Sequence, residues 1–249
     1  MKLYAISDIH TDFIDNFNLI KQIGNYPHDA LILAGDISDN LDIINKTFDL
    51  LQNKFKYVFY TPGNHELWTR NYRYSSLHKL DTIINLCSSR GIITKPHKFQ
   101  AHWIIPLFSW YHCKIPLDNN TIIPEWSDYY LCAWPLFPMD LAEYFGSLNK
   151  QYLKSYEDTV ISFSHFLPTV KLLPNPKYLK FKKLPDVSVS RVLASQIKLI
   201  GSKIHIFGHS HINHDTLIDN VRYIQNALRY PRERKKNVVN LKLVLEIEE

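Results

Sequence analysis

Short apolar segments alternate with helical patterns along the first hundred residues of this 249-residue chain. Three segments have the length and the nearly continuous apolar character of buried strands: residues 3–6, 30–34 and 57–60. Apolar side chains three or four positions apart predict helices in the stretches that follow them: residues 13–23, 41–51 and 77–87. Strands that alternate with helices at this spacing are typical of βαβ units. The sequence therefore predicts an α/β fold with a largely parallel sheet.

The second half of the chain predicts further strands, with one clear helix between them. Apolar segments mark the expected strands: residues 99–108, 160–163, 204–207 and 238–247. Apolar spacing predicts the helix over residues 189–200. Asp219 and Asn220 separate two short apolar segments, 216–218 and 221–224, and are expected to form a two-residue hairpin turn. The chain has no internal repeat or low-complexity linker, so we expect a single domain over its whole length, with an insertion at about residues 110–154.

The composition excludes several classes of protein. Hydrophobic residues make up 45% of the chain and charged residues 21%, which is typical of a globular rather than a disordered protein. The longest stretch without Asp, Glu, Lys or Arg has 15 residues, and no apolar segment precedes the first acid, so neither a membrane span nor a signal peptide is expected. Three cysteines without a CxxC pair predict a reducing, cytoplasmic location. The net charge of +5 suits an anionic substrate without requiring nucleic acid.

Residue types that bind metals follow five of the expected strands, at the point where each strand ends. They are Asp8, His10, Asp36, Asn64, His165, His209 and His211. The carboxyl ends of strands in an α/β sheet meet at one crevice, so we expect these side chains to lie together. Gly35, Gly63 and Gly208, three of only seven glycines in the chain, stand beside them and predict tight turns close to a site.

The chemical types of these side chains favour divalent cations. Carboxylate, amide and imidazole groups without a thiolate suit Mn, Fe or Zn, and they argue against a structural zinc site built on sulfur. Two neighbouring cations repel each other, and a carboxylate shared between them offsets that repulsion. Asp36, which stands alone in its cluster, is suited to this bridging position.

Five motifs in the chain resemble those of the calcineurin-like metallophosphoesterase superfamily. They are DIH at Asp8–His10, GDISD at Gly35–Asp39, GNHE at Gly63–Glu66, the isolated His165 in SFSHFLP, and GHSH at Gly208–His211. The motifs keep the order of the family and span residues 8–211. The resemblance implies a mixed α/β (α+β) fold, a four-layer α/β/β/α sandwich of two mixed sheets flanked by helices.

The resemblance also implies a dinuclear metal centre with defined ligands. One divalent cation (Mn, Fe, Zn or similar) would be held by Asp8, His10, Asp36 and His211. The other would be held by Asp36, Asn64, His165 and His209, so that Asp36 bridges the pair. Such a pair hydrolyses a phosphate ester through a bridging hydroxide. His65 is implied as a catalytic residue that binds no metal and that protonates the leaving oxygen or stabilises the charge of the transition state.

The expected function is hydrolysis of a phosphomonoester on a small phosphorylated substrate. Protein Ser/Thr phosphatases of the superfamily carry an acid–arginine pair that this chain lacks, because Asn40 follows Asp39 and Leu67 follows Glu66. A phosphodiesterase or nuclease acting on a nucleotide or nucleic acid is the first alternative, since the pI is 8.9 and residues 229–236 hold five basic side chains. A catalytically silent scaffold of the same fold is the second.

Several other residues have structural interpretations. His205 alternates with two isoleucines and is expected to face away from the core, and His112 is expected to have a structural role. Asp39 and Glu66 are expected to stabilise loops or to orient ligands. Residues 229–236 are expected to form a solvated turn before the last strand.

Residues 108–137 hold eight aromatic side chains, twice the roughly four that the composition of the chain predicts. They are Phe108, Trp110, Tyr111, Trp126, Tyr129, Tyr130, Trp134 and Phe137. One interpretation is a satellite core that covers an edge of the sheet. The other is a lid beside the site, in which Trp110 and Tyr111 would be the first to contact substrate.

Overall fold

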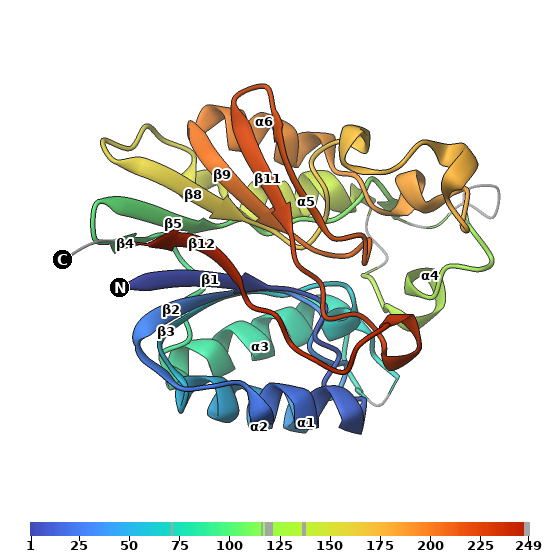
Figure 1. Ribbon diagram of the computed structural model, residues 1–249. Coiled ribbons are helices and arrows are strands. Elements are labelled where there is room, and N and C mark those ends of the chain that lie inside the picture. The colour runs from blue at the N-terminus through green and yellow to red at the C-terminus, as the bar shows by residue number, and fades with distance from the viewer. Residues whose placement is uncertain (71, 116, 118–121, 136–137, 247–249) are drawn as a thin grey trace.

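Two β-sheets packed face to face, with helices on both outer faces, make up the computed structural model (Figure 1). The structure describes residues 1–70, 72–115, 117, 122–135 and 138–246. One sheet is covered by α1 (Ile14–Gln22), α2 (Leu41–Gln52) and α3 (Ser76–Arg90), and the other by α5 (Leu141–Leu148) and α6 (Arg191–Leu199). This arrangement confirms the predicted four-layer sandwich of two mixed sheets.

The first sheet has four strands in the order β12-β1-β2-β3. Their bounds are Lys242–Glu246 for β12, Lys2–Ile6 for β1, Tyr26–Ala34 for β2 and Phe55–Thr61 for β3. Strands β1, β2 and β3 are parallel, as the alternation of strands and helices predicted, and β12 joins β1 antiparallel. The loops after the three parallel strands therefore leave the sheet at the same end.

The second sheet has six strands in the order β10-β11-β9-β8-β5-β4. Their bounds are His214–Ile218 for β10, Val221–Gln225 for β11, Ser202–Phe207 for β9, Thr159–Phe163 for β8, His102–Pro106 for β5 and His97–Phe99 for β4. Its four central strands are parallel, and the two edge strands are antiparallel to their neighbours. Asp219 and Asn220 both have positive φ, 50° and 64°, in the predicted hairpin turn between β10 and β11.

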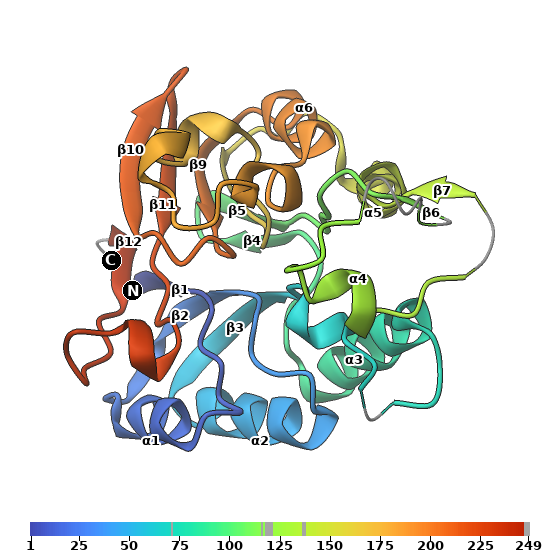
Figure 2. The same ribbon diagram turned by 90° about the vertical axis from the view of Figure 1, so that its right-hand side faces the viewer.

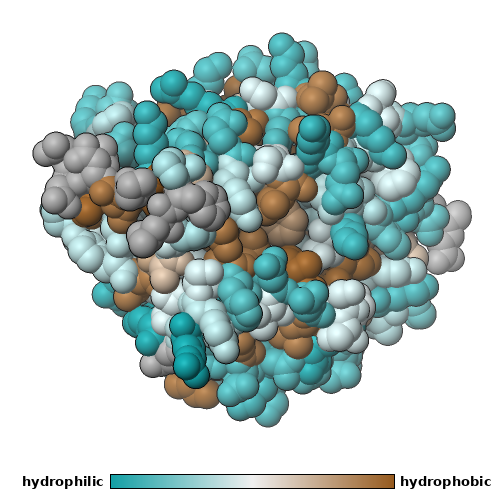
Figure 3. Space-filling model, turned by 180° about the vertical axis from the view of Figure 1, so that it is seen from behind, coloured by the Kyte–Doolittle hydropathy of each residue, from teal (hydrophilic) through white to brown (hydrophobic). Residues whose placement is uncertain are grey.

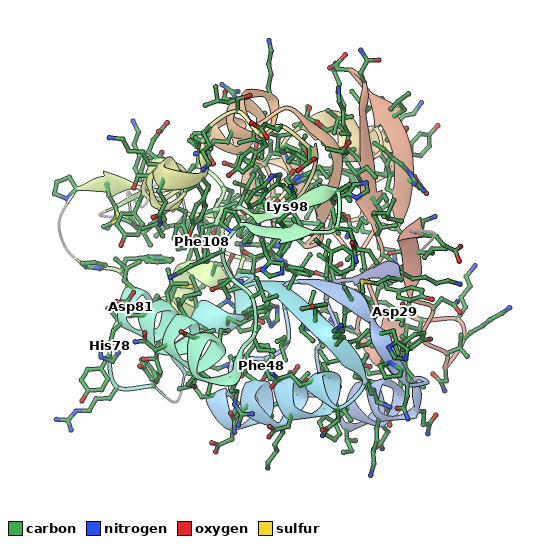
Figure 4. All side chains as sticks on the ribbon, turned by 90° about the vertical axis from the view of Figure 1, so that its left-hand side faces the viewer. Asp29, Phe48, His78, Asp81, Lys98 and Phe108 are labelled. Carbon is green, nitrogen blue, oxygen red and sulfur yellow. The ribbon has the colours of Figure 1, made fainter. Side chains whose placement is uncertain are left out.

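The long apolar run of β2 follows from burial on both faces. Its side chains alternate between two clusters: Leu31 and Leu33 pack toward the helices, whereas Ala30 and Ile32 pack between the sheets. Phe48 is fully buried and points from α2 toward the sheet (Figure 4). Strands covered on both faces lose the alternation of polar and apolar residues, which is why periodicity alone marks them weakly.

His205 is fully buried, and the expectation that it faces away from the core is wrong. It lies on β9, a central strand with packed side chains on both faces, so alternation along this strand does not separate core from solvent. Its Nδ1 lies 2.8 Å from Oγ of Ser162, and its Nε2 lies 3.0 Å from Oγ of Ser164. Two serine hydroxyls on β8 and just after it thus satisfy both ring nitrogens of a buried imidazole.

The segment predicted as an insertion packs beside one end of the sandwich. It contains β6 (Lys114–Ile115), which pairs with β7 (Met139–Asp140), and the short helix α4 (Asp128–Leu131). Its buried aromatic side chains pack on α5 and on Phe166. The predicted strand over 99–108 is two strands, β4 and β5, because Gln100 has a φ of 57° and turns the chain.

The surface is mainly polar. Figure 3 shows teal side chains over most of the face behind that of Figure 1, with apolar side chains gathered near its middle. No helix within the described residues is long and apolar enough to cross a membrane.

Candidate metal centre

The seven candidate ligands lie after the carboxyl ends of β1, β2, β3, β8 and β9, at the end of the molecule that faces the viewer in Figure 2. Five of them have positive φ: Asp8 (50°), His10 (40°), Asp36 (57°), His209 (70°) and His211 (55°). Residues other than glycine adopt this conformation at a cost of about 1–3 kcal/mol each, and they keep it only where the surroundings enforce it. Backbone strain concentrated at five neighbouring residues indicates a functional site.

Two glycines allow the motif loops to approach one another. A Cβ atom on Gly63 would collide with Oδ1 of Asp36, and one on Gly35 would lie 2.5 Å from Nδ1 of His165. Gly35 also has a φ of 78°, which favours glycine. The tight turns that the sequence predicted therefore bring a carboxylate and an imidazole against backbone that has no room for a side chain.

The first donor group consists of Asp8, His10, Asp36 and His211, which offer four ligand atoms within 4.8 Å of one another. Nε2 of His10 lies 3.1 Å from Nε2 of His211, which lies 3.5 Å from Oδ1 of Asp8. Nδ1 of His211 donates to Oε2 of Glu233 over 2.7 Å, so Nε2 is the nitrogen that this imidazole directs into the group.

The electrostatics of this group centre on His211. Burial lowers its pKa, but the carboxylates of Asp8 and Glu233 outweigh burial and raise the pKa to about 9. Burial likewise opposes ionisation of Asp8, yet its hydrogen bond and Coulombic attraction to His211 lower the pKa of that carboxyl to about 2. A cation bound at Nε2 would replace this proton, because metal and proton compete for the same lone pair.

The second donor group consists of Asn64, His165, His209 and Asp36. Oδ1 of Asn64, Nε2 of His165 and Nδ1 of His209 lie 3.0–3.2 Å from one another. Nδ1 of His165 donates to the carbonyl of Ala34 and Nε2 of His209 to that of Val187. In the neutral imidazoles, the nitrogens that face the group therefore carry lone pairs rather than protons.

Three lone pairs thus meet without a proton between them, which is favourable only when a cation lies among them. Atoms that bind one ion at about 2.0–2.2 Å are themselves about 3 Å apart, the spacing found in this group. Burial keeps both imidazoles neutral, since it lowers the pKa of His165 and of His209. Neutral imidazole is the form that binds metals.

Asp36 lies between the two donor groups. Its Oδ2 is 3.9 Å from Nε2 of His10, and its Oδ1 is 3.4 Å from Nε2 of His165. Burial raises the pKa of Asp36, and the charges of Glu66 and Asp8 raise it further. Within the described residues, no lysine or arginine side chain bonds to any of the seven candidate ligands. Nitrogen and oxygen donors with buried carboxylates, and without a bonded lysine or arginine in the described part of the chain, fit divalent metal ions.

Asp128 supports Asn64 from outside the motifs, and sequence reasoning missed it. This fully buried carboxylate on α4 accepts hydrogen bonds from Nδ2 of Asn64 (2.8 Å), Nε1 of Trp68 (2.6 Å) and Nε1 of Trp126 (2.8 Å). Because the amide nitrogen of Asn64 is held here, its oxygen must face His165 and His209. No local pattern around position 128 indicates this contact, which spans 64 residues.

Glu66 and Asp39 stabilise the motif loops, as the sequence predicted. The carboxylate of Glu66 accepts from the backbone N–H groups of Asp36 (3.1 Å), Ile37 (2.5 Å) and Gly63 (2.7 Å) and so joins two motifs. Asp39 accepts from Nε of Arg70 over 2.7 Å and does not reach the donor groups.

A segment near the C-terminus closes one side of the centre. Oη of Tyr230 lies 3.0 Å from Nε2 of His65, and its ring packs on that of His10 at 4.3 Å. Glu233 holds His211 and also accepts from the backbone N–H of Tyr230. The interpretation of residues 229–236 as only a solvated turn is therefore wrong for these two residues, which contact the centre through the fold rather than through a motif.

His65 lies beside the first donor group without belonging to it. Its Nε2 is 3.9 Å from Oδ2 of Asp36, and its ring packs on Trp68 at 3.7 Å. Its backbone N–H donates to Oδ1 of Asp36. This ring is nearly buried and packs on that of His10 at 4.7 Å between ring centroids.

The lid interpretation fails for the two rings named first. Trp110 and Tyr111 are each only 1% exposed and belong to a core cluster with Phe145 and Phe166. Among the described residues of this segment, Trp126 has its ring 5.5 Å from that of His209 and so reaches the centre.

His112 pairs with Asp140 at 3.3 Å, as a structural residue would. Phe137 lies outside the described residues.

The chain belongs to the calcineurin-like phosphoesterase family, whose model matches residues 1–213. It is a metal-dependent hydrolase of phosphoric esters. The family match ends before Tyr230 and Glu233, so the segment that closes the centre is a feature of this chain beyond the family model.

Two comparisons point to similar proteins from Mycobacterium tuberculosis. The acyl-carrier-protein phosphodiesterase PptH is 28% identical over 268 residues, which cover 94% of this chain and 79% of that protein. The crystal structure of phosphopantetheinyl hydrolase (PptH) matches with a TM-score of 0.77 and 25% identity, covering 98% of this chain and 95% of that chain. An uncharacterized protein of Acanthamoeba polyphaga mimivirus is 32% identical over 95 residues, 34% of each chain.

Proposed function

We propose that two divalent cations occupy the two donor groups and share Asp36. The observation that carries this proposal is the convergence of lone pairs from Asn64, His165 and His209 on one side of Asp36, with His10 and His211 on the other. A bound pair of cations would polarise the phosphate ester and lower the pKa of the attacking water. Mn, Fe and Zn all suit this set of nitrogen and oxygen donors.

The residues of the chain orient the reacting groups. Water gives up a proton to solvent and attacks phosphorus, a bond between its oxygen and phosphorus forms, and the bond from phosphorus to the leaving oxygen breaks. His65 is held between Trp68 and Tyr230 beside the centre. Burial lowers its pKa, so we propose that it protonates that oxygen, or stabilises the charge of the transition state, in the protonated form that a bound phosphate anion favours. Glu66 keeps two motif loops together while Asp128 keeps the oxygen of Asn64 aimed inward.

For the substrate we propose a phosphodiester, and within that class the ester that joins phosphopantetheine to its carrier protein. A monoester dianion carries two negative charges and usually needs protein cations beside the metals, but no lysine or arginine in the described part of the chain bonds to the candidate ligands. A diester carries a single charge and needs fewer. The similar protein PptH is named as an acyl-carrier-protein phosphodiesterase, which supports the same choice.

The monoester preference and the small substrate that the sequence favoured are untested, and the proposed diester takes their place as the first candidate. The cytoplasmic location stays a prediction. A nucleotide or nucleic acid remains the second candidate substrate, because residues 229–236 place five basic side chains beside the centre. The silent-scaffold alternative is not supported, since the chain is a hydrolase by family.

The test compares three substrates on the Mn-loaded protein: a phosphopantetheinylated carrier protein, bis(nitrophenyl) phosphate and nitrophenyl phosphate. We expect mass spectrometry to show loss of phosphopantetheine from the carrier, and diester turnover to exceed monoester turnover. A carrier that keeps its group while the monoester is turned over faster would overturn the proposed substrate.

A further inference from the structure

A pocket of about 330 Å³ lies between the C-terminal segment and the ends of β1 and β11, and its charged lining is mainly basic. We call it the basic pocket and define it by its charged lining residues: Arg229, Glu233, Arg234, Lys235 and Lys236. Four cations and one carboxylate thus share one small volume. In Figure 2 the short helical turn of this segment, Pro231–Glu233, is the dark red turn above α1.

The cations of the basic pocket have no ion-pair partner among the described residues. Among the described residues, no carboxylate oxygen lies within 4.0 Å of a side-chain nitrogen of these four residues, and Asp15 acts on Arg234 only from beyond that distance. By contrast, Arg222 and Lys242 both pair with Asp215. The one carboxylate in the pocket, Glu233, is already bonded to His211 and to the backbone of Tyr230.

Three guanidinium nitrogens of the pocket are buried without a hydrogen-bond acceptor: Nε of Arg229, and Nε and Nη1 of Arg234. A buried polar group that lacks a partner costs about 1–3 kcal/mol, and more when it is charged. Guanidinium groups bind carboxylates and phosphates through paired hydrogen bonds. The four cations that line the pocket, without a carboxylate partner among the described residues, make it a site for anionic oxygen atoms of another molecule.

The basic pocket adjoins the metal centre. Glu233 lines the pocket and bonds to His211 of the first donor group. The backbone N–H of Arg229 donates to the carbonyl of Asp8 over 3.0 Å. The basic pocket and the metal centre are therefore built in part from the same segment of the chain.

We propose that the basic pocket docks acidic side chains of a carrier protein beside the phosphodiester that the centre hydrolyses; this rests on the proposed function. A protein carboxylate fits better than a nucleic acid, because the cations are confined to one small pocket. A nucleic-acid backbone would instead require cations along an extended groove. The residues that would bind the carrier's acidic side chains, 229–236, lie outside the part of the chain that the family model matches, residues 1–213.

The test neutralises three of the four cations of the basic pocket with R234Q, K235Q and K236Q in one protein. We expect KM for the phosphopantetheinylated carrier to rise roughly tenfold and to lose most of its dependence on salt. Charges at a binding surface raise the rate at which the partners associate, and salt screens that attraction. The kcat/KM for bis(nitrophenyl) phosphate should change less than about twofold, since this small diester reaches only the centre. Calorimetry of carrier binding should show the same weakening without any turnover.

The control protein removes the same charge elsewhere, with K21Q, K56Q and K203Q. Lys56 and Lys203 lie near the amino ends of β3 and β9, and Lys21 lies in the last turn of α1, all away from the metal centre. A rise in KM common to both variants would show a net-charge effect and overturn the docking site. Unchanged KM in the pocket variant would also overturn it while leaving the proposed function intact.

Two further outcomes separate the occupants of the pocket. If the unmodified protein never processes the carrier, the proposed function fails and the docking site fails with it. If an oligonucleotide inhibits the unmodified protein but not the pocket variant, while carrier KM is the same in both, nucleic acid is the ligand and the proposal is wrong.

Discussion

Asp36 directs one carboxylate oxygen toward each donor group. We expect Asp36→Asn to abolish phosphoesterase activity and to lower bound metal more than His10→Gln or His165→Gln, because each histidine serves one ion whereas Asp36 serves both. The uncharged amide would also leave the repulsion between the two cations without compensation. Elemental analysis of metal per chain, beside turnover, measures both effects. Full activity in Asp36→Asn or in a chelated, metal-free sample would contradict this role.

His65 contacts the centre without occupying a ligand position in either donor group. His65→Asn should therefore leave the metal content near that of the unmodified protein while turnover falls about 10²-fold or more, the scale of general acid catalysis. The loss should shrink for nitrophenyl esters, whose leaving group needs no proton. Metal content that falls in parallel with turnover would show that His65 is a ligand instead.

Asp128 fixes the amide of Asn64, so its loss should act through the second ion. We expect Asp128→Asn to weaken metal binding about 10- to 100-fold, the usual cost of losing a group that orients a ligand. Titration of metal-free protein with Mn²⁺ measures this affinity. Asp140→Asn is the matched control, because Asp140 caps α5 in the same segment and contacts no candidate ligand. Equal affinities in the two variants would remove Asp128 from the centre.

Sequence reasoning identified the residues of the centre that belong to motifs, and it missed those that do not. His209 and His211 are recognised because a local pattern after a strand marks them. Asp128, Tyr230 and Glu233 reach the centre across 64, 165 and 22 residues, through packing that no local pattern records. Their residue types are ordinary for a helix start or a solvated turn, so only the folded chain indicates their roles.

Among the elements, β9 carries the clearest dependence of stability on pH. Burial lowers the pKa of His205 to about 3, whereas the unfolded value is about 6.5. Between these values the unfolded chain binds a proton that the folded chain does not, so stability falls as the pH drops below about 6.5. The free energy of unfolding should lose up to about 1.4 kcal/mol per pH unit from this residue.

Urea unfolding of the unmodified protein and of His205→Gln, from about pH 7 to about pH 4.5, tests this expectation. The other buried histidines titrate in both proteins, so the difference between the two slopes isolates His205. The variant should be less stable near neutral pH, because Ser162 and Ser164 lose their hydrogen bonds to the imidazole. Its free energy of unfolding should, however, fall less steeply as the pH drops. Parallel curves would mean that His205 is protonated in the folded state.

The sequence predicted the positions of strands and helices better than it predicted which of their side chains are buried. The apolar runs predicted β1, β2, β3, β8 and β9, and the apolar spacing over residues 77–87 predicted α3, which ends at Gly91 with a φ of 72°. The segment 99–108 was misread as one strand, because nothing in its pattern marks the turn at Gln100. His205 was misplaced because alternation implies an exposed face only on strands that have one.

At the scale of the whole molecule, the site exists because two sheets pack together. Strands β1, β2 and β3 of one sheet and β8 and β9 of the other all end at the same side, so ligands from both sheets face each other. Strand–helix alternation predicted only the parallel part of this arrangement. The second sheet and the four layers were predicted only through the resemblance of the motifs to a known family. Pairing between strands that are distant in the sequence does not produce a local sequence pattern.

The most direct test of the two-metal centre is a crystal of the Mn-loaded protein with data collected at the manganese absorption edge. Two anomalous peaks are expected, one on each side of Asp36. The first should lie among Asp8, His10 and His211, and the second among Asn64, His165 and His209. A single peak, or peaks away from Asp36, in crystals of protein that is active would contradict the account.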